Sequence, residues 1–275
     1  MLMLKSITTL VAINLLVSCS NTASYNDPIP EHDNFTVQSE HVQEQRVINV
    51  WTPPQYAESN DSYPVLYMPD GGIKEDFPHI ANTISKLIEE KKIAPIILVG
   101  IENTERGRDL TGASTAEYDK QFCPMTDGAK NFRAFIYQEL MPVINEKYRT
   151  TSIKGVVGES LAGLFVMETF LEHPTTFDFY IAMDPSLWWN NHYLVSNADS
   201  LLSRFPNNEL TLWYAGSSAE DISVHTKALQ TNLDQSAPKN LTWKYSDQPI
   251  EKHNTIFRAT KEKAFIWVLR NKSKL

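Results

Sequence analysis

A serine in a glycine-flanked turn is the first feature of this sequence that could carry out chemistry. Gly158-Glu159-Ser160-Leu161-Ala162-Gly163 follows the β-prone run Ile153–Val157 and precedes an apolar stretch. The spacing is close to G-x-S-x-G, in which a tight turn between a strand and a helix exposes a nucleophilic serine oxygen. Ala162 replaces the second glycine, and its small side chain still lets strand and helix approach. We therefore predict Ser160 as a nucleophile rather than a plain helix N-cap.

A nucleophilic serine needs a general base, and four histidines follow Ser160: His173, His192, His225 and His253. His253 lies between the last predicted strand and the last predicted helix, where chains with such a turn carry their base. His173 ends a predicted helix, His192 lies in an aromatic loop and could line a pocket, and His225 lies within a helix. We predict His253 as the base.

The third member of a serine triad is a carboxylate that orients the histidine. The chain order serine, acid, histidine places it after the predicted strand Leu210–Tyr214, in a loop that contains the adjacent residues Glu220 and Asp221. We prefer Glu220 and keep Asp221 as the alternative, because one of the two is expected to supply the N-terminal charge of the following helix. A Ser160–His253 dyad without an acid also stays open.

Backbone N–H groups must stabilise the oxyanion that forms when a serine attacks a carbonyl. Leu161 follows Ser160 at the start of the helix, and its N–H is the first predicted donor. The run Pro69-Asp70-Gly71-Gly72 ends a dense apolar strand, and two glycines there permit close backbone approach. We predict Gly72 N–H as the second donor.

Strands and helices alternate along the chain and must bring these residues together. An antiparallel pair opens the domain, and further apolar strands alternate with helices. The predicted strands are 35–39, 45–51, 63–68, 96–101, 155–157, 179–183, 210–214 and 241–245. The predicted helices are 77–91, 131–148, 162–172, 193–205, 222–233 and 255–269. Strands that are apolar on both faces indicate a mostly parallel sheet covered by helices on both sides, an α/β fold.

The carboxyl ends of parallel strands lie at one edge of such a sheet, where α/β proteins place their sites. The loops after the strands should therefore meet around Ser160. Arg106 and Arg108 follow one buried strand, and Trp188 and Trp189 follow another. We predict these four residues as substrate-binding, with the alternatives that Arg108 pairs with a structural carboxylate and that Trp188 lies in the core.

The N-terminus carries a targeting pattern. Lys5 precedes the apolar run Ile7–Val17, which is too short for a bilayer span of about 20 residues and suits a signal peptide. Leu16-Val17-Ser18-Cys19 looks like the lipobox of bacterial lipoproteins. We predict residues 1–18 as a lipoprotein signal peptide, Cys19 as the lipidated residue, 19–34 as a polar tether and 35–275 as one catalytic domain.

Composition excludes several other classes of protein. The 275-residue chain has a net charge of −8 without a strongly basic cluster, which argues against nucleic-acid binding. Two cysteines cannot form a disulfide framework, and no histidine pair is spaced as metal ligands on one helix face. We expect no structural metal site and no nucleic-acid partner.

The whole domain resembles the putative-esterase family of α/β hydrolases. The similarity rests on YPVLYMPDGG (63–72), VGIENTERGRDLT (99–111), GESLAGLF (158–165) and IAMDPSLWW (181–189). It implies an α/β-hydrolase fold and a serine–acid–histidine mechanism that needs no metal or organic cofactor. Within the family the sequence looks most like siderophore esterases, which cleave serine trilactones that bear catechols. Family members usually carry a serine in place of Asp184.

The resemblance and the motifs lead to one expected function. We expect a carboxylic-ester hydrolase of the bacterial cell envelope, held by a lipid on Cys19 at the periplasmic face of the outer membrane and acting on a siderophore-type catechol trilactone. The alternatives are an esterase for acetyl or feruloyl groups on carbohydrates, an acyltransferase that uses the same residues, and a non-catalytic ligand-binding lipoprotein. The oligomeric state does not follow from the sequence.

Overall fold

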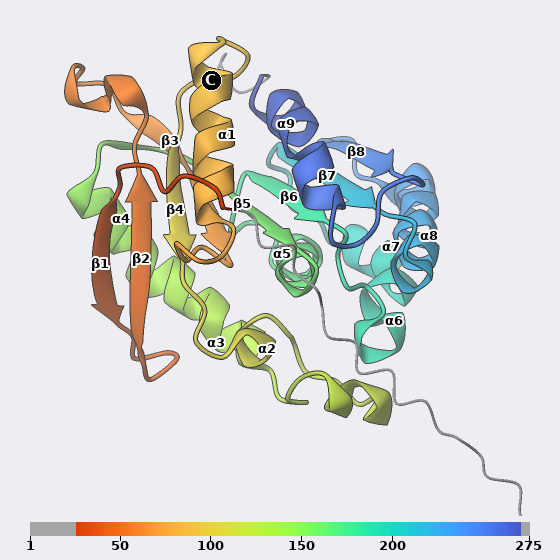
Figure 1. Ribbon diagram of the computed structural model, residues 1–275. Coiled ribbons are helices and arrows are strands. Elements are labelled where there is room, and N and C mark those ends of the chain that lie inside the picture. Colours follow the sequence, from red (N-terminus) through yellow and green to blue (C-terminus); the bar gives the residue numbers. More distant parts are fainter. Residues whose placement is uncertain (1–25, 271–275) are drawn as a thin grey trace, which may run out of the picture.

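The apolar runs of the sequence pair into a single sheet in the computed structural model, which describes residues 26–270 (Figure 1). Its eight strands lie in the order β1-β2-β4-β3-β5-β6-β7-β8. β1 and β2 pair antiparallel, β2 pairs antiparallel with β4, and all other neighbours are parallel. The strands are β1 (Asp33–Gln38), β2 (Gln45–Trp51), β3 (Tyr63–Pro69), β4 (Ile97–Ile101), β5 (Thr150–Glu159), β6 (Phe179–Met183), β7 (Leu210–Gly216) and β8 (Leu241–Asp247).

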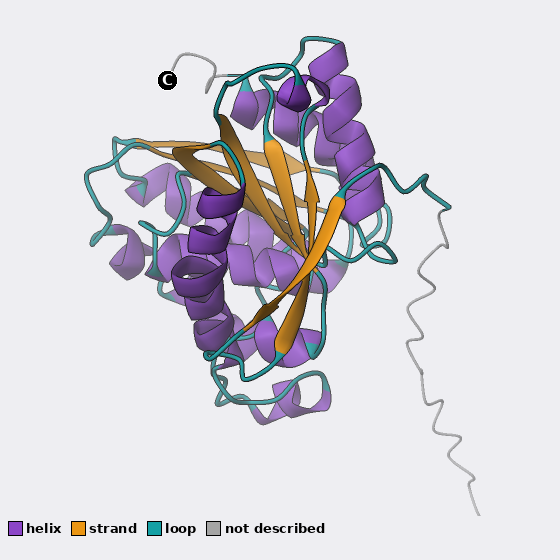
Figure 2. Cartoon of the chain, turned by 90° about the vertical axis from the view of Figure 1, so that its left-hand side faces the viewer, coloured by secondary structure: helices purple, strands orange, loops and turns teal. Residues whose placement is uncertain are grey.

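Helices cover both faces of this twisted sheet (Figure 2). α1 and α9 pack on one face, and α3 to α8 supply the apolar side chains on the other. The helices are α1 (Phe77–Glu89), α2 (Arg106–Asp109), α3 (Gly128–Ala134), α4 (Met141–Lys147), α5 (Leu161–Glu172), α6 (Trp189–Ser196), α7 (Ala198–Leu202), α8 (Glu220–Ser236) and α9 (Ile256–Leu269). Two 3-10 turns, η1 (Pro54–Ala57) and η2 (Glu117–Gln121), and a π-helical segment, η3 (Phe135–Leu140), complete the list.

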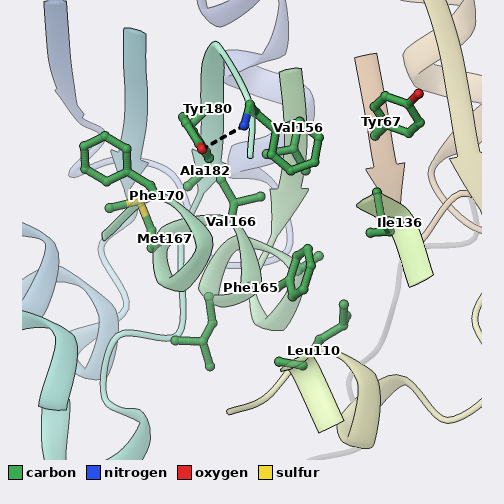
Figure 3. Close-up of a cluster of buried hydrophobic side chains, with 14 of the residues drawn as sticks. Tyr67, Leu110, Ile136, Val156, Phe165, Val166, Met167, Phe170, Tyr180 and Ala182 are labelled. Atoms are coloured by element: carbon green, nitrogen blue, oxygen red, sulfur yellow. Dashed lines mark hydrogen bonds between the residues drawn. The ribbon is translucent and has the colours of Figure 1, made fainter. Parts of the chain in front are cut away.

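The central helix α5 is buried almost all round, which is why its sequence is apolar without a polar face. Figure 3 shows part of the core around it, with Phe170 of α5 beside Tyr180 of β6 at a ring distance of 5.3 Å. Phe165 on the same helix contacts Phe132 of α3 at 5.4 Å. This packing fixes α5, and therefore the serine before it, against β5 and β6.

The predicted α/β fold is confirmed, and most strands and long helices follow the predicted ranges, but the strand expected over 155–157 is the longer β5, and the short elements α2, η1 and η2 were not predicted. The helix expected over 131–148 is continuous, but its middle part η3, between α3 and α4, is π-helical. The backbone hydrogen bonds of a π-helix span five residues instead of four. The helical stretch expected over 193–205 divides into α6 and α7. Three residues with left-handed backbone, at 190–192, interrupt the start of α6.

The described part of the expected tether contacts the domain. Asp27 pairs with Arg258 of α9, and the carbonyl of Pro28 accepts from Asn82 of α1. The predicted signal peptide and Cys19 lie outside the described residues. Within residues 26–270, no helix combines the length and the apolar character needed to cross a membrane.

Candidate active site

Ser160 occupies a strained turn between β5 and α5. Its φ is 59° and its ψ is −118°, a backbone conformation that residues other than glycine rarely adopt. The turn is held from both sides, because Ser160 N–H donates to the carbonyl of Met183 at 2.9 Å and Ser160 carbonyl accepts from Ser186 N–H at 3.1 Å. Strain kept by surrounding hydrogen bonds is typical of a functional residue.

Two glycines make this turn sterically feasible. A Cβ atom on Gly158 would lie 2.6 Å from the carbonyl carbon of Ala162, closer than real Cβ contacts allow. A Cβ atom on Gly163 would lie 3.0 Å from the carbonyl oxygen of Met183, a milder conflict. The predicted role of small residues around Ser160 therefore holds, and Gly158 is the position with the least space.

The structure brings Ser160 and His253 together as predicted. His253 Nε2 lies 3.1 Å from Ser160 Oγ, and His253 Nδ1 lies 2.7 Å from Oδ2 of Asp184. A carboxylate can only accept, so Nδ1 carries the proton and Nε2 of the neutral ring is the acceptor for the Ser160 hydroxyl. The three side chains form a hydrogen-bonded line from carboxylate to hydroxyl.

Asp184 is fully buried and held by the loop after β7. Its Oδ1 accepts from Ser217 N–H at 2.6 Å, and its Oδ2 accepts from Ser217 Oγ at 2.8 Å. The same loop holds the histidine loop, because Ser218 N–H and Oγ both donate to the carbonyl of Glu251, two residues before His253. Asp184 also has a positive φ of 48°, a backbone conformation that residues other than glycine rarely adopt.

The prediction that Glu220, or alternatively Asp221, is the carboxylate partner of His253 is wrong. Glu220 and Asp221 are exposed in the first turn of α8, and no hydrogen bond joins either of them to His253. The loop that we expected to carry the acid instead places Ser217 against Asp184. A signal was present in the sequence, since Asp184 directly follows an apolar strand whose carboxyl end lies at the same edge as Ser160.

The two predicted oxyanion donors differ in the structure. Leu161 is the first residue of α5, so no carbonyl one turn earlier in the helix can accept its N–H. Gly72 N–H instead donates to Glu75 Oε2 at 2.7 Å. Burial is the main cause that raises the pKa of the Glu75 carboxyl. Gly72 N–H, which we predicted as the second oxyanion donor, is therefore already engaged by Glu75 in this structure, and it could serve an oxyanion only if that hydrogen bond broke.

Arg106 belongs to a polar network beneath the site. Its Nε and Nη2 donate to the two carboxylate oxygens of Asp70 at 2.7 and 2.8 Å. Asn103 Nδ2 links Asp70 to Glu75, and Arg106 Nη2 lies 3.4 Å from the carbonyl oxygen of Glu159. The bidentate pair means that Arg106 holds the loop after β3 beside the nucleophile, and its guanidinium is not a free cation for a substrate.

Arg108 points away from this network. It pairs with Asp109 at 2.7 Å and also with Glu44, which lies just before β2. The predicted substrate-binding role of Arg108 is corrected accordingly, and the alternative of a structural carboxylate partner is what the structure shows. Neighbouring arginines on a four-residue helix face different sides, which spacing alone does not decide.

Comparison with known proteins identifies the family of this chain. The family model described as Putative esterase matches residues 39–269. The chain belongs to the Putative esterase family. The chain is 30% identical over 171 residues to the ferri-bacillibactin esterase BesA of Bacillus subtilis, a match that covers 57% of this chain and 58% of that relative. The chain thus spans less than two thirds of the length of BesA.

Two further similarities extend over more of the chain. The apo-salmochelin esterase of Escherichia coli is 25% identical over 240 residues, 80% of this chain and 74% of that protein. The crystal structure of an IroE-like serine hydrolase from Shewanella oneidensis superposes with a TM-score of 0.79 at 27% identity, over 88% of this chain and 81% of that one. Proteins named as siderophore esterases are thus among those to which the chain is similar.

The tandem tryptophans Trp188 and Trp189 differ in burial. Trp189 is buried, and its Nε1–H donates to the carbonyl of Gly112 at 3.0 Å. Trp188 is half-buried and contacts the exposed ring of Phe122 at a centroid distance of 5.1 Å. Of the predicted pair, Trp188 remains available to a ligand, and Trp189 instead packs the loop.

Glu159, directly before the nucleophile, is a buried carboxyl that the sequence did not single out. Its Oε1 is buried and has no hydrogen-bond partner in the described residues. Burial, reinforced by the negative charges of Asp76 and Asp184, raises the pKa of Glu159 well above its ordinary value. The Glu159 carboxyl therefore binds a proton more readily than an ordinary glutamate does.

Proposed function

We propose that this esterase is a serine carboxylic-ester hydrolase in which Ser160, His253 and Asp184 act as nucleophile, base and orienting acid. The observation that carries the proposal is the continuous line of hydrogen bonds from Asp184 through His253 to Ser160. A strained serine at a helix N-terminus, a histidine that can accept its proton and a buried carboxylate behind it meet the geometric requirements of covalent acyl transfer.

The reaction follows from these positions. Ser160 Oγ attacks the ester carbonyl carbon while its proton passes to His253 Nε2, and the carbonyl becomes an oxyanion near Leu161 N–H. The C–O bond to the alcohol then breaks, the alcohol takes the proton from His253, and the acyl group stays on Ser160. A water molecule repeats the sequence, releases the carboxylic acid and restores the Ser160 hydroxyl. Asp184 stabilises the imidazolium in both halves.

A second donor for the oxyanion requires a change at Gly72. When a substrate oxyanion approaches, it competes with Glu75 Oε2 for Gly72 N–H. A carboxyl with a raised pKa is more easily protonated, and a protonated Glu75 accepts this hydrogen bond less strongly. Leu161 N–H is the donor that needs no such rearrangement.

We further propose a siderophore-type ester, a catechol-bearing trilactone, as the substrate. Named relatives support this choice, because BesA is a ferri-bacillibactin esterase and another relative is an apo-salmochelin esterase. The site is also open, since the side chain of His253 is 45% exposed. An open site admits a bulky cyclic ester that an enclosed pocket would exclude.

The cell envelope is the proposed location, with Cys19 as the lipidated residue. Support comes from the sequence, where a charged residue, an apolar run and Leu16-Val17-Ser18-Cys19 occur in that order. A short polar segment then separates Cys19 from Asp27, which contacts the domain. An enzyme so placed would act on esters that enter the periplasm.

Two measurements test the proposed chemistry. A fluorophosphonate should label the wild-type chain on Ser160, and the Ser160→Ala and His253→Ala variants should lose labelling. Product analysis should then compare a catechol trilactone, a feruloylated sugar and p-nitrophenyl acyl esters, with and without an added alcohol acceptor. Labelling that persists in Ser160→Ala would place the nucleophile elsewhere, and preference for the sugar ester or for transfer to the alcohol would favour an alternative function.

A further inference from the structure

Three aromatic side chains form a partly exposed ledge at the surface. Tyr118 and Phe122 are 67% and 51% exposed, and Trp188 is half-buried. The Tyr118 and Phe122 rings lie 5.2 Å apart, edge to face, and the Phe122 and Trp188 rings lie 5.1 Å apart. Exposed rings that touch one another keep apolar surface in water, and such surface commonly marks a binding site. We call these three residues the aromatic ledge.

The ledge is formed by the loop after β6 and the long segment after β4, and each of these contains a residue that contacts the Ser160 turn. Trp188 comes from the loop after β6, in which Ser186 N–H donates to the carbonyl of Ser160. Phe122 comes from the segment after β4. The next residue, Cys123, lies close to Gly107, since its Sγ is 3.0 Å from the position that a Cβ atom on Gly107 would take. Gly107 directly follows Arg106, which lies against the carbonyl of Glu159. Both sides of the ledge are thus connected to the Ser160 turn.

Buried polar contacts hold the ledge in place. Asp119, only 1% exposed, accepts from Ser114 Oγ at 2.6 Å and from Asn190 N–H at 2.7 Å. Asn190 and Asn191 adopt left-handed backbone, which asparagine tolerates better than most residues. This turn directly follows Trp188 and Trp189, and the hydrogen bond from Asn190 N–H to Asp119 fixes its position. A ledge fixed by these contacts is preorganised, so binding a ligand orders little additional structure.

The chemistry of the ledge favours a flat aromatic ring. The Tyr118 and Phe122 rings are more than half exposed, and an aryl group can stack on exposed ring surface. The two arginines first expected to bind a substrate are both engaged with carboxylates. Recognition at this place therefore depends on ring faces rather than on an unpaired guanidinium.

We propose that Tyr118, Phe122 and Trp188 form a subsite that binds an aryl group of the ester substrate and so sets its specificity. This inference rests on the proposed hydrolase function, because the subsite is useful only beside a reactive Ser160. The occupant is an aryl ring attached to the ester through an amide or acyl linkage, as in an N-(2,3-dihydroxybenzoyl)serine ester.

Binding measured without hydrolysis tests the ledge separately from the chemistry. Calorimetry on the full-length Ser160→Ala chain, with N-(2,3-dihydroxybenzoyl)serine methyl ester as the probe, should show binding. Adding Trp188→Ala or Phe122→Ala should weaken it about tenfold, as expected for loss of one aromatic contact with its buried area. Trp188→Phe should restore most of the affinity. Tyr137→Ala is the matched control, because Tyr137 is 54% exposed but comes from η3.

Hydrolysis of a matched pair of substrates provides the second readout. The wild-type chain should prefer the dihydroxybenzoyl ester to N-acetylserine methyl ester, which lacks only the aryl ring. Phe122→Ala and Trp188→Ala should lower kcat/KM for the aryl ester and leave the acetyl ester within about twofold. Equal losses on both esters, or unchanged binding in Trp188→Ala, would overturn the subsite. Binding to the ledge without cleavage of either ester would instead refute the proposed hydrolase function.

Discussion

Asp184→Asn is the substitution that tests the corrected triad most directly. The change keeps the shape of the side chain and removes its charge. Asparagine also tolerates the positive φ of 48° at this position, so the backbone should keep its course. The variant therefore isolates the role of one buried carboxylate.

The hydrogen bonds of Asp184 determine the size of the effect. If the amide NH₂ replaced Oδ1, it would face Ser217 N–H, and two buried donors would oppose each other at a cost of about 1–3 kcal/mol. The NH₂ therefore takes the Oδ2 position and donates to His253 Nδ1, which moves the ring proton to Nε2. In that tautomer His253 cannot accept the Ser160 proton. The preference of about 1–3 kcal/mol for this amide orientation, and so for the inactive tautomer, by itself lowers activity about 5- to 150-fold.

Loss of charge adds a second factor. A hydrogen bond from imidazolium to a carboxylate contributes about 1.5–3 kcal/mol, which corresponds to a further factor of about 10–150. The product predicts a fall in kcat of about 10²–10⁴, which reaches the scale known for the equivalent change in serine proteases. The measurement is kcat on a p-nitrophenyl ester, with the rate of fluorophosphonate labelling as a second readout and a thermal melt to confirm folding.

Glu220→Gln and Asp221→Asn are the matched controls. Each removes one of the two carboxylates that the sequence suggested as the acid. Each should change kcat by no more than about threefold, because both side chains are exposed at a helix N-terminus. If Asp184→Asn stayed within tenfold of wild type while Glu220→Gln lost more than a hundredfold, the acid assignment made from the structure would be refuted.

Three further predictions concern the turn, the core and the anchor. Gly158→Ala should destabilise the chain and lower kcat more than Gly163→Ala does, in denaturation and activity assays. A Cβ atom at position 158 would lie 2.6 Å from the helix backbone, whereas one at position 163 would lie 3.0 Å from its nearest neighbour. Burial raises the pKa of Glu168, paired with Arg133, to about 7, so the native state binds the extra proton. The unfolding free energy should therefore fall as pH rises from about 4.5 to 7, and Glu168→Gln should flatten that slope in urea titrations. Cys19→Ala should shift the chain from the membrane fraction to the soluble or unprocessed fraction; unchanged fractionation, with no lipid on the wild-type N-terminus, would reject the anchor.

Local sequence determined much of the site. The turn around Ser160 is encoded within a few residues, since glycines and alanine are the residues that let a strand and a helix approach closely. The apolar runs determined which segments become buried strands, because a run that is apolar on both faces is stable only inside the molecule. His253 followed from chain order, as the histidine in the loop before the last helix.

The tertiary structure alone decided which carboxylate meets His253. β6 and β7 are parallel neighbours, so their carboxyl ends lie side by side and the loops after both strands can reach the histidine. Sequence order favoured the second loop, but the first carries Asp184, and the second supplies Ser217 to hold it. The choice depends on side-chain directions across two strands, and no local pattern encodes that.

The pairing of the charged loop residues was likewise decided by contacts between distant segments. Arg106 meets Asp70 across 36 positions of the chain, and Gly72 N–H meets Glu75 only because the loop after β3 folds back on itself. Sequence shows that a charge or a donor is present at the active edge. Whether that group is free for a ligand or already engaged depends on which partners the fold brings within about 3 Å of it.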